Sequence, residues 1–438
     1  MKQSFICLCL CVFFCSLKSQ SLYFPPNNNT VWDTISPQSL GYCQDEIDSL
    51  YDLLDQANSK AFLLLKDGKI VLEKYFDTFT KDSIWYWASA GKTMTAMLVG
   101  IAQQEGHLAL SDTTSDYLGA GWTNCTPAQE AKITVRHQLT MTSGLDDGVP
   151  DPYCTLDTCL IYKADAGARW AYHNAPYTLL DGVLEAATGQ NLNAYYISKV
   201  RNPTGMNGFF LPSGYNNVLF TNPRSMARFG LLVLNKGNWN GTQVLKDMAY
   251  YNQMINTSQS LNQSYGYLWW LNGKASFRVP GLQIQFPGPL FPAAPPDMIA
   301  ALGKNGQFIS IVPSQNLLFI RLGDSPGVGE VPYVLCNEIW EKINRLVCLP
   351  TGTGEAGTNA EEVMLYTNPA SASFRIELKN GATDFDLSVW DWTGRQVGVY
   401  KNQPAVNVEN WTKGVYFLKI GVGDGHQMVK KLVVTAGN

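Results

Sequence analysis

The segment Trp87–Met94, WASAGKTM, places Ser89 and Lys92 three residues apart where the sequence turns apolar and helical. A serine at the start of a helix is commonly an N-cap, whose hydroxyl accepts a backbone hydrogen bond. Residues three apart also share one helix face, so the lysine amine can reach the serine hydroxyl. A lysine held partly out of water can lose its charge and take the proton of a serine nucleophile. Both interpretations are open on this segment alone.

Two later segments carry residues that suit the second interpretation. WAYHNAPYTLL, from residue 170, offers Tyr172 and Asn174 just before a predicted helix, and LGKNGQFISIVP, from residue 302, puts Lys304 at the opening of a predicted strand. A phenol near a lysine can relay protons, and a carboxamide can hold a substrate amide. Gly306 permits a carbonyl group to lie close against the strand. A buried tyrosine with a capping asparagine, and a plain surface lysine, are the structural alternatives.

The pattern of apolar residues predicts an α+β fold, with helices before, between and after the strands of one antiparallel sheet. A β-hairpin is expected at 61–76, turning through Asp67 and Gly68, because Asp-Gly between two β-prone runs favours a tight turn. The other expected elements are a long helix from Ser89 to Leu110 that is broken by Gly106, strands within 264–273 and 298–323, and a final helix at about 331–347.

Length and charge limit the classes of function. A chain of 438 residues is too long for one compact core. The net charge is -4 and the sequence has no long basic run, so no basic surface that would bind nucleic acid or an anionic membrane is predicted. We therefore expect a small-molecule or peptide substrate. Residues 1–20 read as a signal peptide whose apolar run is too short to span a bilayer, so no transmembrane anchor is expected.

Six cysteines remain after the predicted signal peptide, and in an exported protein they can form disulfides. Cys154 and Cys159, in CTLDTC, are the likeliest pair, and the loop 146–159 would then form part of a substrate-site rim. Cys336 and Cys348 share one helical pattern and lie roughly 18 Å apart, too far to pair. Free thiols are the alternative for all six. The four histidines are scattered, and neither a metal site nor a cofactor is predicted.

Domain boundaries follow from composition. A first globular region is expected at 21–348, and Gly, Thr and Ala then replace the apolar pattern at 349–362, which reads as a flexible linker. Residues 363–438 are rich in short strand patterns and predict a small β-sandwich.

The order S-x-x-K, Y-x-N, K-x-G resembles the serine β-lactamase and penicillin-binding protein superfamily, and most closely its class C-like branch of esterases, D-amino peptidases and amide hydrolases. The stretch ITVRHQLTMTSGL, from residue 133, is also similar to that branch. The resemblance covers roughly residues 40–347. It implies a mixed helical lobe and an antiparallel sheet with the active site between them.

The resemblance also implies roles for matching residues. Ser89 would be the acylated nucleophile, and Lys92 and Tyr172 would share the acid and base work. The remaining roles concern the substrate: Asn174 would contact the substrate and Lys92, Lys304 would orient Tyr172 or bind a substrate carboxylate, and the backbone N–H groups of Ser89 and Gln307 would form the oxyanion hole. The third motif departs from the commoner K-T-G by having Asn305 at its centre, which makes recognition of a substrate carboxylate less secure than acyl transfer.

The C-terminal region resembles the type A sorting domain of the type IX secretion system of Bacteroidetes, through LYTNPASASFRIEL, VWDWTGRQV and GVYFLKI. This resemblance implies export from a Gram-negative bacterium to the medium or the cell surface, with the type IX machinery as partner. A carbohydrate-binding module is the competing interpretation, with Trp390, Trp392 and Trp411 along one face.

These observations predict an exported serine hydrolase that cleaves an ester or amide through an acyl-enzyme on Ser89. The alternative is a catalytically silent, penicillin-binding-like protein that binds peptide or cell-wall ligands. A surface adhesin whose tail is the working part is a third possibility.

Overall fold

The computed structural model describes residues 22–28, 31–327, 331–347, 363–368, 370–378, 384–391, 396–412, 414–422 and 427–434. The signal peptide expected at 1–20 and the linker expected at 349–362 lie outside these residues. The chain divides into two compact units, Met1–Leu349 and Pro350–Asn438, which are described separately here. Within the described ranges, no helix is long and apolar enough to cross a bilayer.

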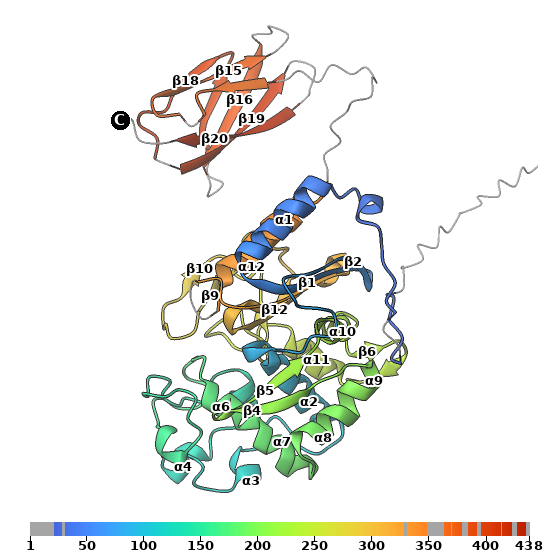
Figure 1. The fold of residues 1–438 in the computed structure, drawn as a ribbon. Coiled ribbons are helices and arrows are strands. Elements are labelled where there is room, and N and C mark those ends of the chain that lie inside the picture. Colours follow the sequence, from blue (N-terminus) through green and yellow to red (C-terminus); the bar gives the residue numbers. More distant parts are fainter. Residues whose placement is uncertain are drawn as a thin grey trace, which may run out of the picture. The chain divides into compact units, whose positions relative to one another are not determined.

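A six-stranded antiparallel sheet forms the centre of the first unit (Figure 1). Its strands in spatial order are β2 (Lys69–Tyr75), β1 (Ser59–Lys66), β13 (Leu317–Gly323), β12 (Gln307–Val312), β11 (Ile299–Gly303) and β8 (Trp270–Leu271). Strands β11, β12 and β13 are buried along their whole length. A strand that is covered on both faces has no polar face, which explains why the sequence shows continuous apolar runs there.

Helices cover both faces of this sheet. Helices α1 (Gln44–Gln56) and α12 (Tyr333–Ile343) pack together on one face, and α10 (Pro223–Leu234) packs against β12 and β13 on the other (Figure 1). Beyond α10 lies a lobe of mostly short helices. Its helices are α2 (Lys92–Gln104), α3 (Ser115–Leu118), α4 (Pro127–Glu130), α5 (Val135–Leu139), α6 (Asn174–Thr178), α7 (Leu180–Thr188), α8 (Leu192–Tyr196), α9 (Asn202–Thr204) and α11 (Met248–Met254).

Three small sheets complete the first unit. They are β3 (Trp85–Tyr86), β5 (Asn216–Thr221) and β4 (Phe209–Ser213); β6 (Asn238–Trp239) with β7 (Thr242–Gln243); and β9 (Ser276–Phe277) with β10 (Phe286–Pro287).

The α+β architecture and the hairpin expected at 61–76 are confirmed, with Asp67 and Gly68 both at positive φ in the turn. Other boundaries differ from the expectation. The helix expected from Ser89 begins only at Lys92, and α2 ends at Gln104, just before the break expected at Gly106, whose φ of 78° leaves the helical region. Within 264–273 only Trp270–Leu271 forms a strand. The final helix is shorter than expected and follows Pro332.

The second unit contains two antiparallel sheets that share one apolar core, as expected for a small β-sandwich. One sheet has β14 (Val363–Tyr366), β15 (Ser373–Leu378) and β18 (Ala405–Asn407); the other has β17 (Gln396–Lys401), β16 (Phe385–Asp391), β19 (Gly414–Val422) and β20 (Gln427–Val434). The Trp411 ring packs against this core beside Phe374 and Tyr416. This position fits a role in core packing better than a role in a carbohydrate-binding face. Trp392 lies outside the described residues.

Candidate active site

Ser89 lies in a 3-10 turn, Ala88–Gly91, that leads into α2. It is not the N-cap of α2, because Gly91 occupies that position and no side chain caps the helix. Ala88, just before it, has a φ of 46°, an unusual value for a residue other than glycine. Trp87 anchors the turn: its backbone N–H donates to the Leu219 carbonyl at 2.8 Å, and its ring nitrogen donates to the Thr221 hydroxyl at 2.8 Å. The turn is therefore fixed from outside the helix.

Lys92 is 4% exposed, and its amine reaches both Ser89 and Asn174. Nζ donates to the Ser89 hydroxyl at 3.0 Å and to the Asn174 amide oxygen at 2.8 Å. The same nitrogen lies 4.2 Å from the centre of the Tyr177 ring. Burial lowers the pKa of Lys92 from 10.5 to about 7, and the carboxylate of Asp181 partly opposes this. A substantial fraction of Lys92 is thus uncharged at neutral pH, and an uncharged amine can accept a proton.

Tyr172 stands on the segment that leads into α6. The neighbouring Ala171 N–H donates to the Met141 carbonyl at 2.9 Å, which fixes the backbone there. The phenol ring stacks on Trp270, with centres 5.8 Å apart, and meets the edge of Tyr265. Burial raises the pKa of Tyr172, and the Ser89 hydroxyl partly opposes that shift. The phenol therefore stays protonated in the free protein and can donate to an oxygen or nitrogen next to Ser89.

Asn174 is the first residue of α6 and is 9% exposed. Its contact with Lys92, expected from the sequence, is present. The amide oxygen is used by the lysine, so the NH₂ group is the part that remains for other partners.

Lys304 follows β11 directly and is exposed. The expectation that it opens a strand is wrong, because Lys304, Asn305 and Gly306 form the turn between β11 and β12. The turn is clamped by the buried Arg321, which donates to the carbonyls of Asn305 at 2.9 Å and Gly306 at 2.7 Å. A Cβ on Gly306 would lie 2.4 Å from Arg321 Nη1, so the absence of a side chain at this glycine makes room for the arginine.

The role expected for Gln307 belongs to its backbone N–H, and strand β12, which begins at Gln307, packs against the serine turn Ala88–Gly91. Gln307 is fully buried at the start of β12, paired across the turn with Gly303, and its amide donates to the Gly323 carbonyl at 2.7 Å. Gly303 is the residue that the sequence interpretation missed. A Cβ there would lie 2.4 Å from the Trp87 carbonyl and 3.0 Å from the Ala90 nitrogen, so only glycine lets β11 approach the serine turn this closely. The signal for Gly303 that the sequence offered was its place as a second glycine three residues before Gly306.

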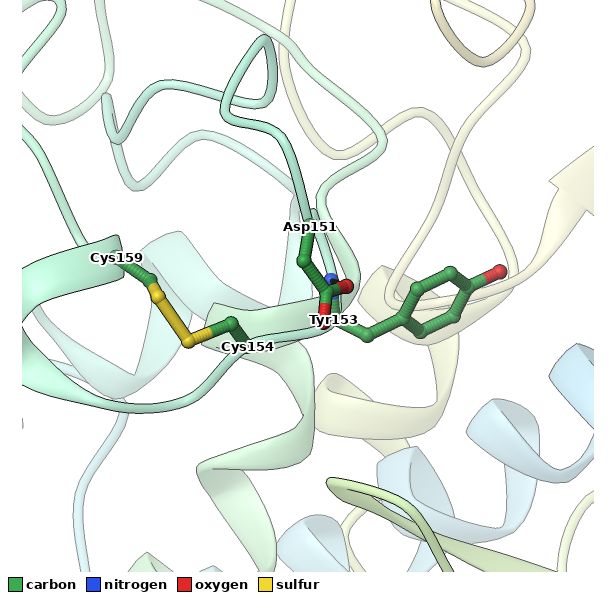
Figure 2. Close-up of a disulfide and its surroundings, with 4 residues drawn as sticks. All are labelled: Asp151, Tyr153, Cys154 and Cys159. Atoms are coloured by element: carbon green, nitrogen blue, oxygen red, sulfur yellow. Dashed lines mark hydrogen bonds between the residues drawn. A yellow bond between two sulfur atoms is a disulfide. The ribbon is translucent and has the colours of Figure 1, made fainter.

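A cavity of about 640 Å³ opens beside Ser89, and Tyr172, Asn174 and Lys304 also line it. Its other walls come from the loop 146–159, from residues 279–281 between β9 and β10, and from Val331 and Tyr333 at the start of α12. The disulfide expected between Cys154 and Cys159 is present (Figure 2), and Asp147, Pro152 and Tyr153 of that loop line the cavity. This loop is therefore part of the rim, as expected.

The remaining cysteines in the described part of the chain differ in state. Cys43 is disulfide-bonded, whereas Cys125 and Cys336 are free thiols. The expectation that Cys336 and Cys348 do not pair is confirmed for Cys336, because its thiol is free.

Each of the two units matches a known family model. Residues 48–330 match the beta-lactamase family model, and residues 364–435 match the secretion system C-terminal sorting domain. No curated protein sequence matches the chain.

Three solved structures show the same fold at low sequence identity. A putative beta-lactamase from Bacteroides dorei DSM 17855 is 18% identical over 70% of this chain and 99% of its own, with a TM-score of 0.57. A putative 6-aminohexanoate-dimer hydrolase from Bacillus anthracis is 19% identical over 73% and 88%, with a TM-score of 0.55. A penicillin-binding protein homologue from Caulobacter crescentus is 13% identical over 69% and 98%, with a TM-score of 0.53.

The sorting domain marks the chain as a protein that the type IX system exports to the medium or the cell surface, as predicted. The family model spans well over half of the chain and contains the segment with Ser89 and Lys92. The chain therefore belongs to the beta-lactamase family of serine hydrolase folds, with a C-terminal secretion sorting domain.

Proposed function

We propose that this protein is an exported serine hydrolase that cleaves an ester or amide through an acyl-enzyme on Ser89. The observation that carries the proposal is the contact of 3.0 Å between the buried Lys92 Nζ and the partly buried Ser89 hydroxyl, with the lysine pKa lowered to about 7 by burial. A serine hydroxyl is a weak nucleophile until a neighbouring base takes its proton. An uncharged Lys92 supplies that base.

The reaction then runs in two halves. Ser89 Oγ attacks the substrate carbonyl carbon while its proton passes to Lys92, and a tetrahedral oxyanion forms. Tyr172 donates its phenolic proton to the leaving oxygen or nitrogen as that bond breaks, and is reprotonated from Lys92. Water attacks the acyl-enzyme in the second half, and the same two groups remove its proton and return one to Ser89.

The oxyanion needs donors aimed at the position where charge develops. We assign this role to the backbone N–H groups of Ser89 and of Gln307, the residue that follows the turn after β11. The close approach of Gly303 to the Trp87 carbonyl and the Ala90 nitrogen supports that assignment. Asn174 holds Lys92 in place through its amide oxygen, and Lys304, exposed at the cavity, attracts an anionic substrate group.

Three substrates separate the activities in this class: a chromogenic short-chain ester, nitrocefin and a D-amino-acid amide. We expect turnover of the ester or the amide, and loss of at least about a thousandfold in Ser89→Ala, as for removal of a catalytic nucleophile. Equal background signals from wild type and Ser89→Ala with all three would refute the hydrolase proposal and favour a silent binding protein.

A further inference from the structure

The cavity beside Ser89 has an apolar side. Beyond the reactive groups, its lining includes Pro152, Tyr153, Val279, Pro280 and Gly281. The charged residue near this side, Asp147, is neutralised by Arg169, whose Nη2 lies 2.5 Å from its carboxylate. This side of the cavity therefore consists of rings and aliphatic carbon, and the Asp147 carboxylate beside it is paired. Such a surface suits an apolar group of a substrate better than a charged group.

Tyr153 is held in this wall by its immediate neighbours. Its backbone N–H donates to the Asp151 carboxylate at 2.9 Å, and the Cys154 N–H donates to the Asp151 carbonyl at 3.2 Å. The next residue, Cys154, is tied to Cys159 by the disulfide. Figure 2 shows the Tyr153 ring pointing away from the disulfide. The turn and the staple together restrict the backbone on both sides of the ring.

The same loop is attached to the helix that carries a site residue. The Ala175 N–H of α6 donates to the Pro152 carbonyl at 3.1 Å, directly after Asn174. Tyr153 and Tyr172 line the same cavity as Ser89. The position of Tyr153 is therefore fixed relative to Ser89 and Lys92.

The second apolar part comes from the connection between β9 and β10. After Val279, Pro280 and Gly281, this connection carries two exposed aliphatic side chains, Leu282 at 44% and Ile284 at 58%. Gln283 between them anchors the connection by donating to the Trp170 carbonyl at 3.1 Å. Apolar surface thus continues along this loop beyond the cavity lining.

We propose that Tyr153 and the Val279–Gly281 segment form a subsite for an apolar chain or ring next to the scissile bond, and that the Cys154–Cys159 disulfide keeps Tyr153 in it. The substrate class is accordingly esters or amides with an extended apolar group beside the reacting carbonyl. This inference rests on the proposed function, because it assumes that the reacting carbonyl lies at Ser89.

Phosphonylation rates test the subsite without knowledge of the natural substrate. An alkyl fluorophosphonate reacts when Ser89 Oγ forms a bond to phosphorus, the P–F bond breaks, fluoride leaves and the serine proton passes to Lys92. We expect wild type to react at least about tenfold faster with the octyl probe than with the methyl probe. Tyr153→Ala should lower this octyl-to-methyl ratio about tenfold, which corresponds to ~1.4 kcal/mol, chiefly through a fall in the octyl rate.

Matched variants distinguish the wall from a general loss of structure. Tyr153→Phe should keep the ratio, and the double variant Cys154→Ser/Cys159→Ser should lower it as Tyr153→Ala does. Tyr162→Ala is the control, because Tyr162 lies in the same region of the chain but outside the cavity lining. An unchanged ratio in Tyr153→Ala, no chain-length preference in wild type, or a parallel fall in both rates would overturn the subsite. If neither probe labels the protein, the proposed function is overturned instead, and the subsite with it.

Discussion

At the scale of single residues, the site depends on Lys92. An amine that is buried almost completely costs several kcal/mol if it stays charged without a partner, so burial favours the neutral form. Two acceptors, Ser89 and Asn174, and the face of Tyr177 at 4.2 Å hold the amine in either charge state. The arrangement keeps a lysine in place and makes it basic at the pH where the serine must react.

The pH dependence of acylation follows from this lysine. Because burial lowers the pKa of Lys92 to about 7, the protonated and inactive form dominates below that value and the neutral base above it. We expect kcat/KM for an ester to rise with pH through a midpoint near 7 and to level off above it. The measurement is initial rates between pH 5 and 9 in buffers of constant ionic strength. A flat profile would contradict a lysine base.

Asp181 on α7 adjusts this midpoint. It is buried, its Oδ2 accepts a hydrogen bond from Asn217 at 3.1 Å, and its charge favours protonated Lys92. Burial raises the pKa of Asp181 to about 7, so the two groups titrate together. Asp181→Asn removes the negative charge, and we expect the midpoint of kcat/KM to move down by about one pH unit or less.

Glu185→Gln serves as the control for Asp181→Asn. Glu185 lies on the same helix and is exposed, and its charge raises the pKa of Asp181 without acting directly on Lys92. Its pH profile should stay within a few tenths of a unit of wild type, on the scale of an exposed charge. A midpoint that moves upward in Asp181→Asn would show that the carboxylate does not act on the lysine in the way described.

At the scale of elements, the β11–β12 hairpin brings the sheet to the serine turn. Buried Arg321 on β13 fastens the hairpin turn by donating to the carbonyls of Asn305 and Gly306, and its Nε donates to the Ser59 hydroxyl at 2.8 Å. Burial lowers the pKa of Arg321 to about 10. The carbonyls of the hairpin turn and the Arg321 guanidinium all have hydrogen-bond partners. The hairpin is therefore a rigid support for the residues that face Ser89.

Gly303→Ala tests that close approach. The new methyl group would lie 2.4 Å from the Trp87 carbonyl, so β11 must move away from the serine turn. We expect a loss of ~1–3 kcal/mol in the free energy of unfolding and a fall in kcat of about a hundredfold, as for a displaced oxyanion donor. Urea denaturation and steady-state kinetics measure the two effects. Gly421→Ala is the control, since a Cβ there meets no atom within 4 Å, and it should change neither quantity.

The sequence predicted the elements that have strong local signals. The hairpin at 61–76 follows from Asp-Gly between β-prone runs, and the S-x-x-K spacing is a local property of one turn, so both could be read directly. Gly303, Asp181 and Tyr153 could not be identified as site residues. Their importance comes from contacts between segments far apart in the chain, such as β11 with the serine turn and α7 with α2. The oxyanion role of the Gln307 backbone N–H was assigned by motif position, and it stays a prediction.

At the scale of the whole molecule, the two units have separate apolar cores. Every residue that lines the Ser89 cavity belongs to the first unit. The sorting domain therefore contributes nothing to the chemistry that we propose, and an adhesin whose tail is the working part would require the opposite division of roles.

Removal of the second unit tests this division. A chain that ends within 349–362 should keep the ester turnover of the full-length protein within about twofold, because stabilising contacts within a domain come from its own core. The same truncation should prevent export by the type IX route, and cell fractionation followed by an activity assay measures both effects. Loss of turnover in a truncated chain with unchanged circular dichroism would contradict the independence of the two units.

The central claim is that Lys92 makes Ser89 a nucleophile, and intact-protein mass spectrometry after exposure to a fluorophosphonate tests it most directly. We predict a single adduct, mapped to Ser89 by peptide sequencing and absent from folded Ser89→Ala and Lys92→Ala variants. No adduct on folded wild-type protein, or an equal yield of adduct on Lys92→Ala, would contradict the account.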